Sequence, residues 1–132
     1  MAWAGIRITA AIIVAASLSA APPLIDAAKN NDKAAVRDFI AKKADVNAPA
    51  ADGTTALHWA SYRDNVDMAD LLLKAGAKPN AANDLGVTPL WPASENGSSA
   101  MVKRLLEAGA NPNLALLSGE TSLMVAARSG YP

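Results

Sequence analysis

His58 is the only residue of this 132-residue chain whose side chain is typical of acid–base catalysis at neutral pH, and the chain has no cysteine. Without cysteine there are no disulfides, thiolate zinc sites, iron–sulfur clusters or cysteine nucleophiles, and one imidazole excludes every metal motif that uses two histidines. His58 could act as a general base or a metal ligand, but no second His or Cys stands ready to assist it. We therefore interpret His58 as structural and expect no catalytic residue, no metal site and no cofactor.

Two further groups of residues could in principle bind a metal ion or accept a glycan. Asp64, Asp67 and Asp70 cluster near a predicted helix start, but calcium needs several oxygen ligands on a glycine-containing loop, and this spacing does not match one. A helix N-terminus attracts aspartate through its dipole, which is the interpretation we adopt. Asn96-Gly97-Ser98 is a glycosylation sequon that matters only in a eukaryotic secretory pathway. The chain contains no phosphate-binding glycine loop, nucleophile elbow or paired carboxylates.

The overall charge says what kind of partner to expect. Twelve Lys and Arg balance twelve Asp and Glu, so the formal net charge is zero. A balanced chain has no single-sign field, which argues against nucleic acid or an anionic membrane as the main partner. A hydrophobic content of 52% with 18% charged residues is too apolar for a disordered chain. We expect a folded domain with a protein partner and no small-molecule substrate.

Residues 1–21 have the three-part layout of a secretory signal peptide. Arg7 supplies a positive charge, Ile8 to Leu18 is uncharged, and small residues such as Ser17 and Ser19 lie at the end of this run. This predicts a periplasmic or secreted protein, and the absence of cysteine fits an exported fold that needs no disulfides. An uncleaved membrane anchor is the alternative. Pro22-Pro23 interrupts the apolar stretch, however, and the part before it is too short to span a bilayer.

A spacing of 33 residues organises the rest of the chain. Six columns of residues share this step. They are Leu24/Leu57/Leu90/Leu123, Ala27/Ala60/Ala93/Ala126, Gly53/Gly86/Gly119, Thr55/Thr88/Thr121, Gly76/Gly109 and Asn47/Asn80/Asn113. Units therefore fall at about 22–49, 50–82, 83–115 and a truncated 116–132. The repeat predicts stacked structural units and not one irregular core.

Each unit is predicted to contain a glycine turn, a short helix and a longer helix. Threonine after the turn is placed to cap the first helix, and Pro89 suits a first helical position. Apolar residues at i, i+3 and i+4 give the second helix one apolar stripe, and Gly76 and Gly109 follow as helix stops. The stripes are Val36/Phe39/Ile40, Ala69/Leu72/Leu73 and Val102/Leu105/Leu106. The expected fold is an all-α solenoid.

The repeated motifs resemble the ankyrin repeat. TALHWA at 55–60, TPLWPA at 88–93 and TSLMVA at 121–126 match its Thr-Pro-Leu-His-x-Ala core, and AGAKPN at 75–80 and AGANPN at 108–113 match its ending. The resemblance covers about residues 22–130. It implies that His58 is the motif histidine, bonded to backbone near the turn, and that Trp59 and Trp91 pack between repeats.

The resemblance also implies a non-catalytic module that binds a partner protein through a concave face and its turn tips. Leu85 and Val87 stand out because they are apolar residues that we expect to be exposed at a turn tip. The expected partner-binding residues are Asp52, Thr54, Tyr62, Arg63, Asp84, Leu85, Val87, Glu95, Asn96, Ser118, Glu120 and Arg128.

The units differ from one another in ways that carry expectations. Lys43 replaces the glycine of later units, and the first unit is rich in charges, which suits an N-terminal cap. Trp91 replaces the motif histidine. Pro92 follows it and should make that helix start late or distort.

The fourth unit has no second helix, so Leu123, Met124 and Val125 are expected to lack their partner. We therefore expect a fragment of a longer protein or a frayed last turn. The alternative function is accordingly the N-terminal interaction segment of a larger exported enzyme or membrane-tethered protein.

Overall fold

The computed structural model describes residues 21–129, so the predicted signal peptide lies, except for Ala21, outside the described residues. The described part is helical. Four inner helices are α2 (Pro23–Lys29), α4 (Ala56–Tyr62), α6 (Leu90–Glu95) and α8 (Ser122–Ser129). Three outer helices are α3 (Lys33–Ala41), α5 (Val66–Lys74) and α7 (Ser99–Glu107). No helix in residues 21–129 is long and apolar enough to cross a membrane.

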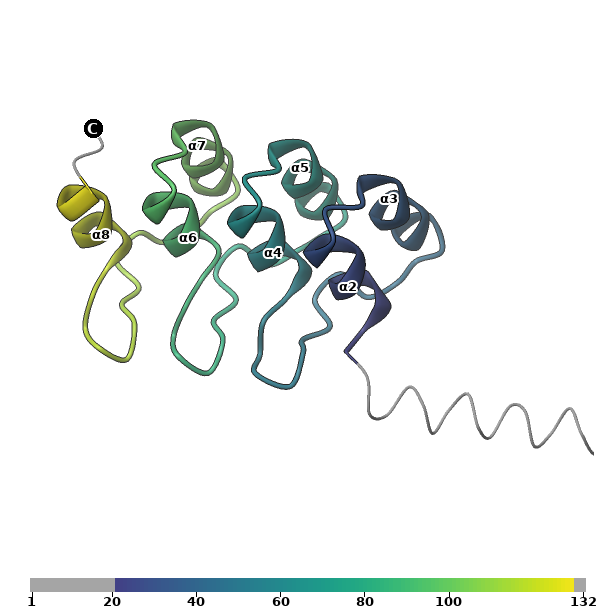
Figure 1. Cartoon of the computed structure of the whole chain (residues 1–132), viewed down its shortest axis with the longest axis horizontal. Helices are drawn as coiled ribbons and strands as arrows, with labels where there is room; N and C mark the ends of the chain where they lie inside the picture. The colour runs from purple at the N-terminus through teal and green to yellow at the C-terminus, as the bar shows by residue number, and fades with distance from the viewer. Residues whose placement is uncertain (1–20, 130–132) are drawn as a thin grey trace, which may run out of the picture.

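The helices form two parallel rows (Figure 1). In one row α2 packs on α4, α4 on α6 and α6 on α8, and in the other α3 packs on α5 and α5 on α7. The leucines with the 33-residue spacing line up along the inner row, where Leu24, Leu57 and Leu90 are 3%, 0% and 2% exposed. The alanines that follow them are also buried, which lets neighbouring helices approach closely. The all-α solenoid expected from the spacing is confirmed.

Each outer helix is held at its start by a polar cap and along one side by the apolar stripe. The side chains of Asp32, Asn65 and Ser98 accept hydrogen bonds from backbone N–H groups three residues on, at 3.0, 3.0 and 3.2 Å. Along the stripes, Leu72 and Leu105 are fully buried. Burying one such leucine contributes roughly 1.5–3 kcal/mol, so the stripe is a substantial part of the packing energy of each unit.

The loops that lead into α4, α6 and α8 project from the helices as separate fingers (Figure 1). Each finger is a tight turn in which a glycine N–H bonds back three residues, as Gly86 does to the Asn83 carbonyl at 2.9 Å. Neighbouring fingers are joined by backbone bonds from Asp84 N to Asp52 O at 2.8 Å and from Leu117 N to Leu85 O at 3.1 Å. The fingers therefore form a continuous ladder.

One asparagine clamps the first unit to the second, and another clamps the second unit to the third. Asn47 donates to the Gly76 carbonyl at 3.0 Å and accepts from Lys78 N at 2.8 Å. Asn80 repeats the pattern one unit later, with the Gly109 carbonyl at 3.0 Å and Asn111 N at 2.7 Å. The asparagine column of the sequence is thus a column of hydrogen-bonded clamps.

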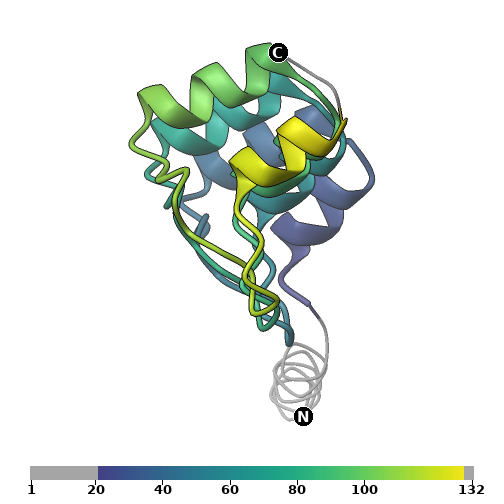
Figure 2. The same cartoon turned by 90° about the vertical axis from the view of Figure 1, so that its left-hand side faces the viewer.

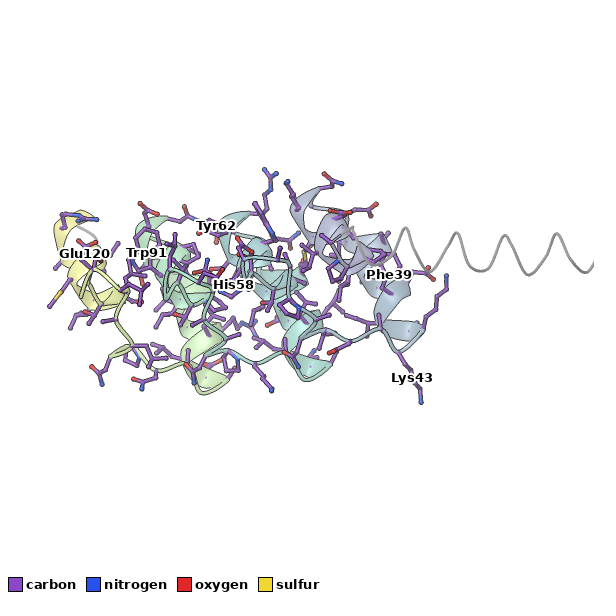
Figure 3. The ribbon with its side chains drawn as sticks, turned by 90° about the horizontal axis from the view of Figure 1, so that it is seen from below. Phe39, Lys43, His58, Tyr62, Trp91 and Glu120 are labelled. Atoms are coloured by element: carbon purple, nitrogen blue, oxygen red, sulfur yellow. The ribbon has the colours of Figure 1, made fainter. Side chains whose placement is uncertain are left out.

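His58 is buried inside the stack and joins two units (Figure 3). Its Nδ1 accepts from Thr55 N at 3.1 Å, so its Nε2 carries the proton and donates to the Val87 carbonyl at 2.8 Å. Burial lowers the pKa of His58 despite the opposing effect of the Val87 bond. A neutral imidazole with both nitrogens bonded to its own chain has a structural role, as expected from the sequence.

The third unit departs from the second where proline was expected to disturb it. Helix α6 begins at Leu90, one repeat position later than α4, and Pro89 in place of Thr88 occupies its N-cap. A tight bond from Trp91 N to the Thr88 carbonyl at 3.0 Å replaces the regular first turn, because Pro92 has no N–H to donate. The late start is confirmed, whereas the Thr88 cap is not observed. Nε1 of Trp91 is buried without a hydrogen-bond partner among residues 21–129.

The fourth unit is covered on one side only. Val125 is fully buried, so the expectation that it would lack a packing partner is wrong: its side of α8 packs against α6. Leu123 and Met124 are 71% and 58% exposed, as expected for residues that no outer helix covers.

The first prediction concerns the pH dependence of stability through His58. Because burial lowers the pKa of His58 in the folded protein, the unfolded chain takes up a proton first as the pH falls below the ordinary value of 6.5. Stability is therefore complete above that pH and falls below it, by up to about 1.4 kcal/mol per pH unit. His58→Gln should lower stability by about 2–4 kcal/mol at pH 7.5 and remove this decline. Urea unfolding at pH 7.5 and 5.5 measures both effects, and equal pH slopes in the two proteins would contradict the assignment.

The second prediction compares two glycines at equivalent fingertips. Gly86 has φ +82°, and a Cβ there would lie 3.1 Å from Leu117 N and 3.2 Å from Leu116 Cα. Gly119 has φ +89° but nothing within 4 Å of such a Cβ. Gly119→Ala should cost about 1–2 kcal/mol from backbone strain alone. Gly86→Ala should cost clearly more, because the next finger has to move away, and equal thermal midpoints would show that the finger ladder yields freely.

Candidate functional site

The exposed sides of the inner helices and the adjoining fingers form one continuous surface, which we call the inner face (Figure 2). At the C-terminal ends of the helices it carries a row of side chains with the 33-residue spacing. The row is Lys29, Tyr62, Glu95 and Arg128, one residue from each inner helix. All four are exposed, Tyr62 by 40%. Three of them are among the residues expected from the sequence to bind a partner. Lys29 is not, although it occupies the same repeat position as the other three.

Aromatic and charged groups surround Tyr62. Its ring lies 5.5 Å from the Trp59 ring, and Lys29 Nζ lies 5.5 Å from the same Trp59 ring. Partial burial raises the pKa of the Tyr62 phenol, and the carboxylates of Glu95 and Asp52 raise it further. The phenol therefore stays protonated at neutral pH and offers a hydrogen-bond donor beside an apolar ring.

Arg63 and Asn96 occupy the next column and connect units through their side chains. Arg63 Nε donates to the Lys29 carbonyl at 2.9 Å, and Asn96 Nδ2 donates to the Ser61 carbonyl at 3.2 Å. Both side chains remain exposed. Each side chain therefore joins two units by a hydrogen bond and also presents polar atoms to solvent. Their residue types alone did not indicate both roles.

The fingertips supply the second part of the inner face. Asp52, Asp84 and Ser118 are exposed, and Leu85 is 66% exposed, as expected for an apolar residue at a tip. Leu117, which was not among the residues expected to bind a partner, is 79% exposed on the next finger. The pKa of Asp52 is lowered, chiefly because its carboxylate accepts a hydrogen bond from Thr54 N at 3.0 Å. These tips therefore combine apolar and negatively charged groups.

Two expected surface residues are buried. Val87 is 6% exposed, so the expectation that it lies at a turn tip is wrong. Val87 N donates to Asn83 Oδ1 at 3.0 Å, and its carbonyl accepts from His58, so the residue belongs to the segment by which the finger returns to the helices. Thr54 is also 6% exposed and is unavailable to a partner.

The last two expected residues pair with each other, since Arg128 donates to Glu120 Oε1 at 2.6 Å.

Two of the three clustered aspartates, Asp67 and Asp70 of α5, form ion pairs between outer helices. Asp67 lies 3.2 Å from Lys33 Nζ, and Asp70 lies 3.4 Å from Arg104. Within residues 21–129 no group of three His, Cys, Asp or Glu side chains could hold a metal ion. The side chains of the inner face can offer charge, hydrogen bonds and apolar contact.

Comparison with known proteins agrees with this architecture. The family model for ankyrin repeats (3 copies) matches residues 24–115 and 77–132. The chain is 50% identical over 52 residues to the ankyrin repeat and LEM domain-containing protein 1 homolog of Caenorhabditis elegans, covering 39% of this chain and 7% of that protein. It is 45% identical over 62 residues to neurogenic locus notch homolog protein 1 of Homo sapiens, covering 47% of this chain and 2% of that protein. The chain thus spans only a small part of the length of these relatives. Because the family model matches most of the chain, and the helix pairs stack as the repeat predicts, the chain belongs to the ankyrin-repeat family.

Proposed function

We propose that this chain binds a partner protein through its inner face and has no catalytic role of its own. Ankyrin repeats are a family of protein-interaction modules, and the inner face provides the groups that such contacts use. The observation that carries the proposal is the row Lys29, Tyr62, Glu95 and Arg128, because it presents one exposed side chain per unit at a fixed interval on a rigid stack. Aromatic residues and arginine contribute most to protein interfaces.

The charge of the inner face favours a partner surface of mixed sign. Lys29 and Arg128 are positive, Glu95 is negative, and Asp52 and Asp84 add negative charge at the fingertips. A polyanion such as nucleic acid would meet repulsion from the acidic side chains. Leu85 next to Asp84 adds an exposed apolar group that a partner can desolvate.

The third prediction tests the inner face directly. A photo-crosslinking residue at position 62 should capture a partner from cells of the source organism, whereas the same residue at position 74, on the exposed outer helix α5, should not. With the captured partner in hand, Tyr62→Ala and Leu85→Ala should each weaken binding by about tenfold, the loss typical of an interface hot spot.

The matched controls are Lys42→Ala and Lys74→Ala, which remove exposed charges away from the inner face. For Arg63→Ala the thermal midpoint has to be measured together with the affinity, because this change also removes the hydrogen bond to the Lys29 carbonyl and can lower stability. Unchanged affinity in both the Tyr62 and Leu85 variants, with native helicity, would rule out this face.

We also propose that residues 1–21 direct export, cleaved as a signal peptide. The support is the sequence pattern of Arg7, the uncharged run and the small residues after it. Membrane anchoring without cleavage is the alternative.

The fourth prediction follows from this export signal. A fusion of residues 1–30 to a reporter that is active only outside the cytoplasm should be active, and Ile13→Asp should abolish its activity by placing a charge in the apolar run. Thr9→Ser is the matched control and should leave it active. N-terminal sequencing of the exported product distinguishes cleavage from anchoring, and an active Ile13→Asp fusion would contradict export by this segment.

A further inference from the structure

Tyr62 lies between a cation and a carboxylate along the row of the inner face. On the α2 side is Lys29, whose Nζ is 5.5 Å from the Trp59 ring. On the α6 side is Glu95, at the equivalent position one unit later. Asn96, which ends α6, donates from its side chain to the Tyr62 carbonyl at 3.4 Å. This bond holds the end of α6 that carries Glu95 beside the end of α4 that carries Tyr62.

The carboxylates on the α6 side have no counter-ion. Glu95, Asp52 and Asp84 are exposed and make no ion pair with any residue in 21–129. The next cation in the row, Arg128, is already paired with Glu120 at 2.6 Å. The two fingertip acids are adjacent, because Asp84 N donates to the Asp52 carbonyl at 2.8 Å. This side of the inner face is therefore complementary to a positively charged group.

The aromatic rings add a surface on which a cation can lie. The Tyr62 and Trp59 rings are tilted by 48° with 5.5 Å between their centroids. The position of Lys29 shows that this pair of rings attracts a cation within the chain itself. Partial burial raises the pKa of the Tyr62 phenol, and the negative charges of Glu95 and Asp52, which are close enough to act on it, raise the pKa further. An aromatic ring and two carboxylates thus act on the same small region.

The guanidinium group of arginine fits this arrangement better than the ammonium group of lysine. A guanidinium is planar, so it can stack on an aromatic ring while its N–H groups donate to carboxylates at its edge. It is also more weakly hydrated than an ammonium, so it loses less hydration free energy on binding. Only a planar cation with several donors can use the ring and both carboxylates at once.

We propose that Tyr62, Glu95 and Asp52 form a subsite for an arginine side chain of the partner protein. The guanidinium stacks on Tyr62 on its α6 side and donates hydrogen bonds to the carboxylates of Glu95 and Asp52. Lys29, on the α2 side, remains near enough to oppose the bound cation. This inference rests on the proposed function and adds the chemical class of the group that the partner contributes.

The fifth prediction tests the subsite with a short peptide in place of the partner. Acetyl-Gly-Arg-Gly amide, titrated at low ionic strength into the chain labelled with nitrogen-15, should shift the backbone amide signals of Tyr62 and Glu95. The dissociation constant should be millimolar, because an exposed ion pair and an exposed cation–π contact each contribute little. The same peptide with citrulline, which has the shape of arginine without its charge, should bind about fivefold more weakly, and with lysine about threefold more weakly.

Variants of the chain identify the groups that bind the peptide. Glu95→Gln, Asp52→Asn and Tyr62→Ala should each weaken binding of the arginine peptide about threefold. Lys29→Gln should strengthen it about twofold, because a repelling positive charge is removed. The matched control is Glu107→Gln, which removes an exposed carboxylate from the outer helix α7 and should leave the affinity unchanged.

The fold is expected to survive the two amide substitutions. Asparagine at position 52 can still accept the hydrogen bond from Thr54 N, and Glu95 makes no ion pair within residues 21–129. Equal affinity for the arginine and citrulline peptides, or for the arginine and lysine peptides, would overturn the proposal. So would the absence of a saturable shift at Tyr62, or an affinity that neither amide substitution changes.

Failure of this subsite is distinguishable from failure of the proposed function. A partner captured by the crosslinker at position 62, together with no binding of the arginine peptide, would refute the arginine subsite and leave the inner face as the binding surface. A captured partner whose binding is weakened about threefold by Glu95→Gln, but not by Glu107→Gln, would support the subsite in the complete complex.

Discussion

Every part of this structure depends on the burial of one unit's apolar side chains by its neighbours at a constant offset. A single helix pair has no second layer of its own, so Leu57 becomes fully buried only because α2 lies on one side of α4 and α6 on the other. The stability of such a stack is close to a sum of interfaces between adjacent units. This explains why Leu123 and Met124 of α8, at the end of the stack, are exposed.

Apolar burial alone would leave the offset between units loosely defined, and hydrogen-bonded polar side chains define it. His58 connects the N-terminus of its own helix to the Val87 carbonyl of the next finger, while Asn47 and Asn80 each hold a carbonyl and an N–H of the next loop. A sliding unit would leave the buried imidazole of His58 without its partners, at a cost of about 1–3 kcal/mol, and would also break the hydrogen bonds of the two more exposed asparagines. The directional bonds thus select one stacking geometry from the many that hydrophobic contact would tolerate.

The sequence predicted the units, the helix types and the late start of α6, because these depend on spacing and on the missing N–H of Pro92, which are local properties. It was less successful for the surface. Leu85 and Val87 look alike in sequence, but the finger turns between them, so one points to solvent and the other supplies the carbonyl bound by His58. Which side of a turn a residue faces depends on the neighbouring unit. Lys29 was not predicted for a different reason. The residue type at its repeat position differs from unit to unit, so a search for repeated residue types does not detect this position.

That variability separates the two roles of the repeat. Columns that pack or clamp keep one type of residue, such as leucine, alanine or asparagine, because each meets the same environment in every unit. The column of Lys29, Tyr62, Glu95 and Arg128 changes charge and size at every step, yet all four side chains reach the same exposed edge. A position that packing does not constrain can be occupied by whatever a partner requires, so a variable column on an invariant scaffold is where recognition is expected to reside. Arg63 and Asn96 show where this separation is incomplete, since each connects two units and still faces solvent.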